Sequence, residues 1–84
     1  MNVLFSSQAW DEYQEWQRTD KQTLKKINEL IRDIARNQYQ GIGKPEPLKY
    51  ALSGFWSRRI TQEHRLVYRI EGDVIEIAQL RYHY

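Results

Sequence analysis

The sequence has no cysteine among its 84 residues, so neither a disulfide nor a thiolate-bound metal can stabilise the fold. We therefore expect a protein of the reducing cytoplasm. It also lacks an apolar run long enough to span a membrane, and the stretch Val3-Leu4-Phe5 has no basic segment before it, which argues against a signal peptide. A large net charge is absent as well. With 13 Lys and Arg against 11 Asp and Glu, the formal charge of +2 by itself indicates no class of partner.

Aromatic residues are plentiful, with three Trp, six Tyr and two Phe. Each ring can bury roughly 150–250 Å² in a core, or stack on a nucleic-acid base, so their number does not separate a structural role from a binding role. A chain of 84 residues is too short for two cores, and we expect residues 1–84 to form a single domain. Cations gather in residues 49–69, where Glu63 is the one acid, and this predicts a cationic surface. They are Lys49, Arg58, Arg59, Arg65 and Arg69.

The first half of the chain has the apolar spacing of helices. Residues 1–5 predict a short strand, and Ser6-Ser7 predicts the start of a helix. The apolar stripe of this helix is Ala9, Trp10, Tyr13 and Trp16. Thr19 followed by Gln22 resembles a capping box that starts a second helix, antiparallel to the first. The apolar face of the second helix is Leu24, Ile27, Leu30, Ile31 and Ile34.

The second half predicts a loop followed by strands. Two glycines and two prolines between Asn37 and Leu48 exclude a continuous helix or a central strand, so this segment should be a loop. Beyond it, turn residues separate four strand-like segments, 50–52, 55–61, 65–70 and 74–82. The order β-α-α-β-β-β-β predicts an α+β fold, with two N-terminal antiparallel helices packed on one face of a mostly antiparallel, twisted sheet. The other face would be free for function.

Glu46 is a carboxylate between two prolines of the loop, Pro45 and Pro47. Proline fixes its own φ and favours extended backbone at the residue before it, here Lys44 and Glu46, so the carboxylate should sit on a stiff arm. A base that takes the proton from a ribose 2′-hydroxyl needs such a fixed position. A solvated loop glutamate is the alternative, and the sequence pattern alone leaves both open.

His83 and Arg65 are the other candidates for acid–base chemistry on a phosphodiester. His83 lies in the C-terminal run RYHY, and its imidazole can exchange a proton near neutral pH, although an exposed terminal histidine would look the same. Arg65 begins a predicted strand. Its guanidinium could stabilise charge developing on phosphorus, or simply pair with a neighbouring glutamate.

The strand register decides whether these residues meet. A three-residue turn at 71–73 would put all the odd-numbered basic residues on one face, with Arg65 opposite Gln79 and His83 roughly 13 Å farther along. A two-residue turn would separate Arg65 from His83. The odd-numbered set is Arg59, Arg65, Arg69, Arg81 and His83.

The remaining histidine, His64, falls on the opposite face from Arg65 by strand alternation, and we assign it a structural role. Two histidines and scattered carboxylates show no metal-ligand spacing. The glycines at 41 and 43 are not followed by the Lys-Ser/Thr pair of a phosphate-binding loop. The sequence therefore predicts no cofactor.

Four segments, in this order and at these separations, resemble YoeB-type toxins, a branch of the RelE/ParE toxin superfamily. The segments are 43–49 (GKPEPLK), 52–60 (LSGFWSRRI), 63–68 (EHRLVY) and 81–84 (RYHY). The resemblance extends over nearly the whole chain, including Trp10 and residues 19–21 and 25–31.

The resemblance implies the RelE/ParE-like microbial RNase fold and the toxin of a type II toxin–antitoxin system. Such a toxin is a ribosome-dependent endoribonuclease that cuts messenger RNA in the ribosomal A site, without a metal, and so inhibits translation. By position, Glu46 corresponds to the general base, His83 to the general acid and Arg65 to the residue that steadies the phosphate. The positions implied to support the site are Lys49, Arg59, Glu63 and Tyr84.

The implied partners are a YefM-type antitoxin, the ribosome and its messenger RNA. A homodimer and operator binding through the antitoxin are further expectations, and no membrane is expected. Two other interpretations use the same residues. One is a ParE-like module that blocks its target without cutting it. The other is a generic RNA-binding domain that stacks bases on Trp56, Tyr82 and Tyr84.

Overall fold

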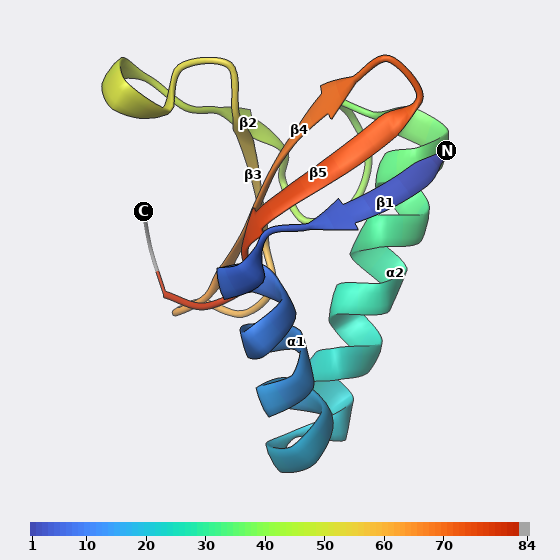
Figure 1. The fold of residues 1–84 in the computed structure, drawn as a ribbon, viewed down its shortest axis with the longest axis vertical. Helices are drawn as coiled ribbons and strands as arrows, with labels where there is room; N and C mark the ends of the chain where they lie inside the picture. Colours follow the sequence, from blue (N-terminus) through green and yellow to red (C-terminus); the bar gives the residue numbers. More distant parts are fainter. Residues whose placement is uncertain (83–84) are drawn as a thin grey trace.

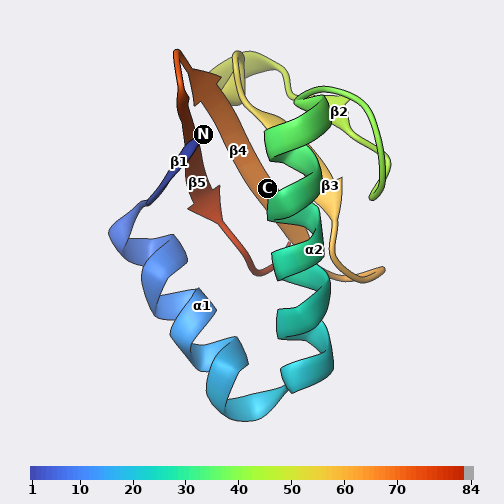
Figure 2. The ribbon, with the colours of Figure 1, turned by 90° about the vertical axis from the view of Figure 1, so that its right-hand side faces the viewer.

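Two helices lie against one face of a five-stranded sheet in the computed structural model, which describes residues 1–82 (Figures 1 and 2). The sheet order is β1-β5-β4-β3-β2, with β1 parallel to β5 and the other neighbours antiparallel. The predicted α+β fold is confirmed. The helices are α1 (Ser7–Thr19) and α2 (Lys21–Asn37). The strands are β1 (Asn2–Phe5), β2 (Glu46–Pro47), β3 (Trp56–Arg59), β4 (Arg65–Glu71) and β5 (Val74–Gln79).

Helix α1 begins at Ser6, as predicted. The Ser6 hydroxyl accepts a hydrogen bond from the Ala9 N–H (3.0 Å) and donates one to the Ala78 carbonyl (2.9 Å), which ties the helix start to β5. Ala9 and Trp16 are buried, but the predicted stripe fails at Trp10, which is 47% exposed. The Trp10 ring lies outside the core because it stacks on Tyr13 at the surface (centroids 6.0 Å apart, planes at 8°).

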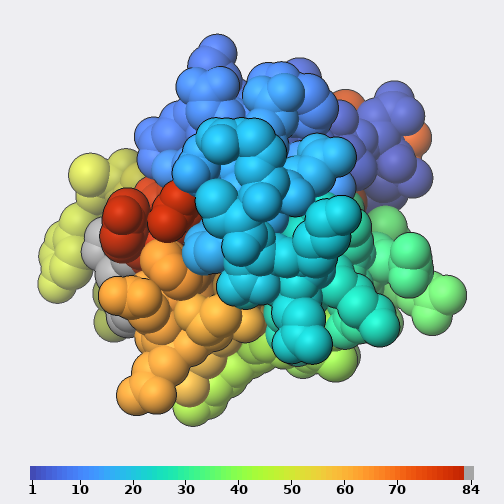
Figure 3. Space-filling model, turned by 90° about the horizontal axis from the view of Figure 1, so that it is seen from below, coloured from blue at the N-terminus to red at the C-terminus, as the bar shows by residue number. Residues whose placement is uncertain are grey.

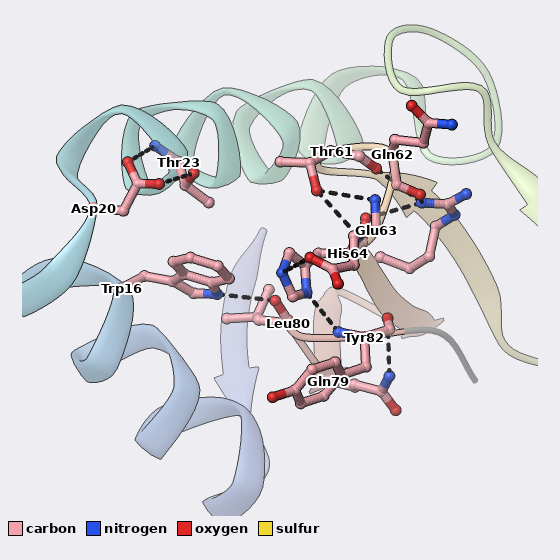
Figure 4. A network of polar contacts seen from close by, with 11 residues as sticks. Trp16, Asp20, Thr23, Thr61, Gln62, Glu63, His64, Gln79, Leu80 and Tyr82 are labelled. Carbon is pink, nitrogen blue, oxygen red and sulfur yellow. Dashed lines mark hydrogen bonds and ion pairs between the residues drawn. The ribbon is translucent and has the colours of Figure 1, made fainter.

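Helix α2 is capped by Asp20, and the predicted capping box at Thr19 is wrong. The Asp20 carboxylate accepts from the Thr23 N–H (3.1 Å) and the Thr23 hydroxyl (2.7 Å), as Figure 4 shows. These bonds hold the pKa of Asp20 below its usual value. Thr19 remains in α1 and donates to the Glu15 carbonyl. A charged cap at the positive end of the helix dipole is the stronger of the two candidates.

The core lies between the helices and the sheet. The predicted face of α2 is confirmed, since Ile27, Leu30 and Ile34 are fully buried. Alternate residues of β4 and β5 meet this face, and the residues between them point to the other side of the sheet. The core members from the sheet and its C-terminal extension are Leu66, Tyr68, Ile75, Ile77 and Leu80. Neither helix within residues 1–82 has the length and apolar character needed to cross a membrane.

Residues 50–52 are not the strand that the sequence pattern predicts. The Leu48 N–H donates to the Phe55 carbonyl (2.9 Å) and closes the β2–β3 hairpin before residue 50. Residues 49–54 are therefore the hairpin loop, and the 3₁₀ turn η1 (Tyr50–Leu52) lies within it. The first strand after the helices is instead β2, an edge strand of two residues, where Pro47 is tolerated.

Arg58 is fully buried and holds the loop after α2 against the sheet. Its guanidinium pairs with Asp33 and donates to three loop carbonyls, those of Gln38, Gln40 and Ile42. The hydrogen bond from Arg58 lowers the pKa of Asp33. Burial raises the pKa of Tyr68, whose neutral hydroxyl donates to the Gln38 carbonyl (2.6 Å). Arg58 is thus a core residue and no part of a cationic surface.

Replacing Arg58 by Met should destabilise the fold by about 3–5 kcal/mol, because Asp33 and three carbonyls lose their partner in a buried site. The matched control is Arg69→Met, which removes a partly exposed pair with Glu76 (3.0 Å) and should cost about 1 kcal/mol or less. Urea unfolding followed by circular dichroism measures both. Equal losses in the two variants would contradict this role of Arg58.

Candidate active site

The sheet face away from the helices carries a row of side chains from four strands. Glu46 of β2 pairs with Ser57 of β3, Ser57 with Val67 of β4, and Val67 with Gln79 of β5. Paired residues point to the same face of a sheet. Ser57 and Val67 are buried, so they form the floor between Glu46 at one end of the row and Gln79 at the other.

Two arginines lie on the same face, Arg59 two residues after Ser57 in β3 and Arg65 two residues before Val67 in β4. Arg59 and Arg65 pair with each other across β3 and β4. Glu46 Oε1 is 4.0 Å from Arg59 Nη2, and both side chains are about half exposed. From strand spacing and rise, the Cα atoms of Glu46 and Arg65 are about 12 Å apart. A carboxylate and a guanidinium at this separation can approach a phosphate-sized group from opposite sides.

The Arg65 guanidinium is oriented by the turn that precedes β4. Its Nη1 donates to the carbonyls of Thr61 (2.8 Å), Gln62 (3.1 Å) and His64 (3.1 Å). Nε and Nη2 take no part in these three bonds. One edge of the guanidinium is therefore fixed to the protein, and the other edge can present two parallel N–H donors to an anion.

Strand β5 contains one extra residue relative to β4, so the pairing of the two strands differs from both regular registers considered for the sequence. Glu71 pairs with Val74, so the turn has two residues, which in a regular ladder would separate Arg65 from the chain end. A register shift between Val67 and Tyr68 inserts the extra residue, and Val67, not Arg65, lies opposite Gln79. Of the two turns considered, the two-residue turn is the one observed, and the pairing of Arg65 with Gln79 that a three-residue turn would give does not form.

The shift brings the end of the chain beside Arg65. The Arg65 N–H donates to the Tyr82 carbonyl at 3.1 Å. The backbone of Tyr82 is therefore in direct contact with Arg65. The predicted gap between Arg65 and His83 involves a residue that the structure does not describe. His83 and Tyr84 themselves lie outside the described residues.

The predicted basic stripe is not continuous. Arg69 pairs with Glu76, and the Arg81 guanidinium lies 4.6 Å from the centre of the Trp16 ring, on the helix side. Two lysines that the sequence pattern did not single out, Lys26 and Lys44, line an open depression with Arg59 and Arg65. Lys26 belongs to α2 and Lys44 to the loop, so only the tertiary fold brings them together, and no local motif could have indicated this.

The loop reaches Glu46 by a turn that proline rules did not predict. Lys44 has φ +55°, although it precedes Pro45 and should be extended. Gly43 has φ +79°, and a Cβ there would lie 2.6 Å from the Leu30 side chain. The Gly43 carbonyl accepts from the Arg59 N–H (2.7 Å), so the loop is tied to β3 just before Glu46.

Two other predicted site residues, Lys49 and Glu63, lie in the segments before and after β3. Lys49 is exposed and precedes η1. Glu63 is largely exposed, and its Oε1 lies 3.3 Å from Nε2 of His64. His64 is buried, which agrees with a structural role. Among residues 1–82, no three His, Asp or Glu side chains form a metal-binding group.

Solved structures share this architecture over the whole chain. A YoeB dimer from Staphylococcus aureus superimposes with a TM-score of 0.94 at 52% identity, covering 100% of this chain and 98% of that one. A YoeB-YefM complex from the same organism gives 0.94 at 50% identity, with the same coverage. The open face carries one carboxylate, Glu46, and two arginines, Arg59 and Arg65. The fold and this face are those of a small bacterial toxin of the RelE/ParE type.

The sequence comparisons narrow the class. The model of the family described as "YoeB-like toxin of bacterial type II toxin-antitoxin system" matches residues 5–84. Toxin YoeB of Escherichia coli strain K12 is 60% identical over 84 residues, which is 100% of both chains. This chain belongs to the YoeB-like toxin family, and it is the toxin of a type II toxin–antitoxin system.

Replacing Arg65 by Lys tests how the turn orients this side chain. Lysine keeps the charge, but its single nitrogen cannot both bind the turn carbonyls and face a ligand. We expect a loss of about 1 kcal/mol in urea unfolding and faster amide exchange in residues 61–64. Arg59→Lys is the control and should cost less than about 0.5 kcal/mol, since its ion pair is exposed. Equal stability of the two variants would contradict the assignment.

Proposed function

We propose that this toxin is a ribosome-dependent endoribonuclease that cuts messenger RNA in the ribosomal A site and so inhibits translation. The observation that carries the proposal is the common face of Glu46, Arg59 and Arg65, with the Tyr82 backbone bonded to Arg65 at 3.1 Å. A base, a charge-stabilising guanidinium and a terminal histidine are the groups that cleavage of a phosphodiester by a neighbouring hydroxyl requires.

The proposed reaction has four steps of charge and proton movement. Glu46 takes the proton from a 2′-hydroxyl, and the oxygen attacks the adjacent phosphorus. Arg65 stabilises the negative charge that develops on the phosphoryl oxygens, using the edge of its guanidinium that faces away from the turn. His83 gives a proton to the departing 5′-oxygen. The products are a 2′,3′-cyclic phosphate and a free 5′-hydroxyl.

The scheme assigns supporting roles to the neighbouring residues. Arg59 directs the Glu46 carboxylate toward the face, and Lys49 and Tyr84 contact the substrate. Glu63 acts through His64, whose Nε2 lies 3.3 Å from Glu63 Oε1. Side chains carry both proton transfers and the charge stabilisation, so the proposed reaction needs no metal ion bound by the toxin.

The need for a ribosome follows from the openness of the site. Glu46 and Arg59 are about half exposed, and the depression beside Arg65 is open to solvent. Such a face can bind a phosphate but cannot hold a flexible RNA with its 2′-oxygen in line with the leaving oxygen. A messenger fixed in the ribosomal A site supplies the missing alignment.

The proposed partner is a YefM-type antitoxin, the type of protein that accompanies YoeB in the Staphylococcus aureus complex. Its toxin-binding segment should be acidic and apolar, because it has to cover the cations beside Glu46. We also propose that the chain forms one domain and acts in the cytoplasm. We propose further that it forms a homodimer. The toxin–antitoxin complex would bind operator DNA through the antitoxin.

Glu46→Gln and His83→Gln should each slow cleavage on programmed ribosomes by at least about 100-fold, because each removes a proton-transfer group. The control is Glu71→Gln, the same change at an exposed glutamate at the far end of β4, which should cut like the parent. Primer extension over a messenger with a defined A-site codon measures the rates. Parent-like cutting by the Glu46 or His83 variant would overturn the assignment, and translation arrest with intact RNA would indicate a ParE-like blocker.

A further inference from the structure

The buried side chain of His64 binds the backbone at the end of the chain. The Tyr82 N–H donates to Nδ1 of His64 at 2.8 Å, and the imidazole packs edge-on against Trp16 (centroids 5.0 Å apart, planes at 78°), as Figure 4 shows. Nδ1 can accept only if it carries no proton. His64 must therefore be neutral, with its hydrogen on Nε2.

Glu63 favours this tautomer. Its Oε1 lies 3.3 Å from Nε2 of His64, so the carboxylate charge favours a hydrogen on that nitrogen. Both residues belong to a turn that the Thr61 hydroxyl stiffens by accepting from the N–H groups of Glu63 (3.2 Å) and His64 (3.1 Å). A carboxylate near one ring nitrogen and a backbone N–H that donates to the other favour this tautomer and this orientation of the ring.

Tyr82 is held from two sides in a conformation that a tyrosine rarely adopts. Its φ is +60°, in the left-handed region, which costs about 1–2 kcal/mol for a residue with a Cβ. Its N–H donates to His64 Nδ1, and its carbonyl accepts from the N–H of Arg65, the residue that follows His64. Two adjacent residues, His64 and Arg65, thus bind the peptide groups before and after Tyr82.

Leu80, two residues before Tyr82, is fixed independently by α1. The Leu80 N–H donates to Glu12 (2.7 Å), and its carbonyl accepts from Trp16 Nε1 (3.0 Å). Figure 3 shows the C-terminal residues, in red, between α1 in blue and the turn around residue 62 in orange. Contacts of α1 therefore hold the chain up to residue 80, and the His64 turn holds residue 82.

We propose that His64 is a positioning residue: its neutral imidazole, oriented by Glu63, holds Tyr82 so that the two residues after it start from a fixed point beside Arg65. The proposal deepens the proposed function, on which it rests for the role of His83, while the hydrogen bond itself can be tested without any assay of cleavage. His64 contacts neither substrate nor reacting atoms in this scheme.

The variants His64→Asn and His64→Leu separate the hydrogen bond from packing. Asparagine places its carbonyl oxygen where Nδ1 stands and can still accept from Tyr82, whereas leucine fills the space without an acceptor. In amide hydrogen exchange, the Tyr82 N–H should exchange at least about tenfold faster in His64→Leu than in the parent, and His64→Asn should restore most of the protection. Leu80 should keep its protection in both variants.

On programmed ribosomes, His64→Leu should lower kcat about tenfold or more with little change in KM, and His64→Asn should recover much of the loss. Unchanged exchange at Tyr82 in His64→Leu would overturn the proposal whatever the activity. Faster exchange with an unchanged kcat would overturn the positioning role. If the parent itself does not cut, the proposed function fails with it, while the exchange data still decide whether His64 holds the chain end.

A measurement on the unaltered protein covers the case in which His64→Leu does not fold. Nitrogen-15 NMR of the imidazole distinguishes a protonated nitrogen from an unprotonated one. The proposal requires unprotonated Nδ1 and protonated Nε2 at neutral pH. A hydrogen on Nδ1 would overturn it.

Discussion

The register of β5 against β4 is the constraint on which the candidate site depends. One extra residue in β5 shifts the pairing between Tyr68 and Val67, so that Val67 lies opposite Gln79. The chain that follows β5 then continues alongside β4 toward Arg65. The backbone bond between Arg65 and Tyr82 follows from that shift. Without it, the two-residue turn would put the end of the chain out of register with Arg65. β-bulges are common beside active sites because they redirect a strand end in this way.

A second constraint acts at the other end of the row, where the loop delivers Glu46. A buried cation is costly unless it is paired and hydrogen-bonded, and Arg58 meets that condition only if the loop after α2 closes over it. The need to satisfy the guanidinium therefore fixes the loop. The hydrogen bond from the Arg59 N–H to the Gly43 carbonyl then holds the loop just before β2. Glu46 therefore lies on the same face as Arg65.

Local patterns could predict the elements but not the contacts between them. The 3.6-residue period predicted the buried face of α2 correctly, whereas Trp10 satisfies the same period in α1 and is exposed. Arg58 and Arg59 are chemically identical neighbours, and only strand alternation against the packed helices makes one a core residue and the other a half-exposed residue on the open face of the sheet. Alternation placed Arg65 and His64 on opposite faces, but no local signal reveals the extra residue in β5.

The central proposal is that the face carrying Glu46 and Arg65 cuts RNA by attack of the neighbouring 2′-hydroxyl. The chemical ends of the RNA test it most directly. Purified protein is added to ribosomes programmed with a messenger of known A-site codon, and the new ends are identified by mass spectrometry. We predict a cut within that codon that leaves a 2′,3′-cyclic phosphate and a 5′-hydroxyl. A 3′-hydroxyl with a 5′-phosphate, or a messenger left intact, would contradict the proposal.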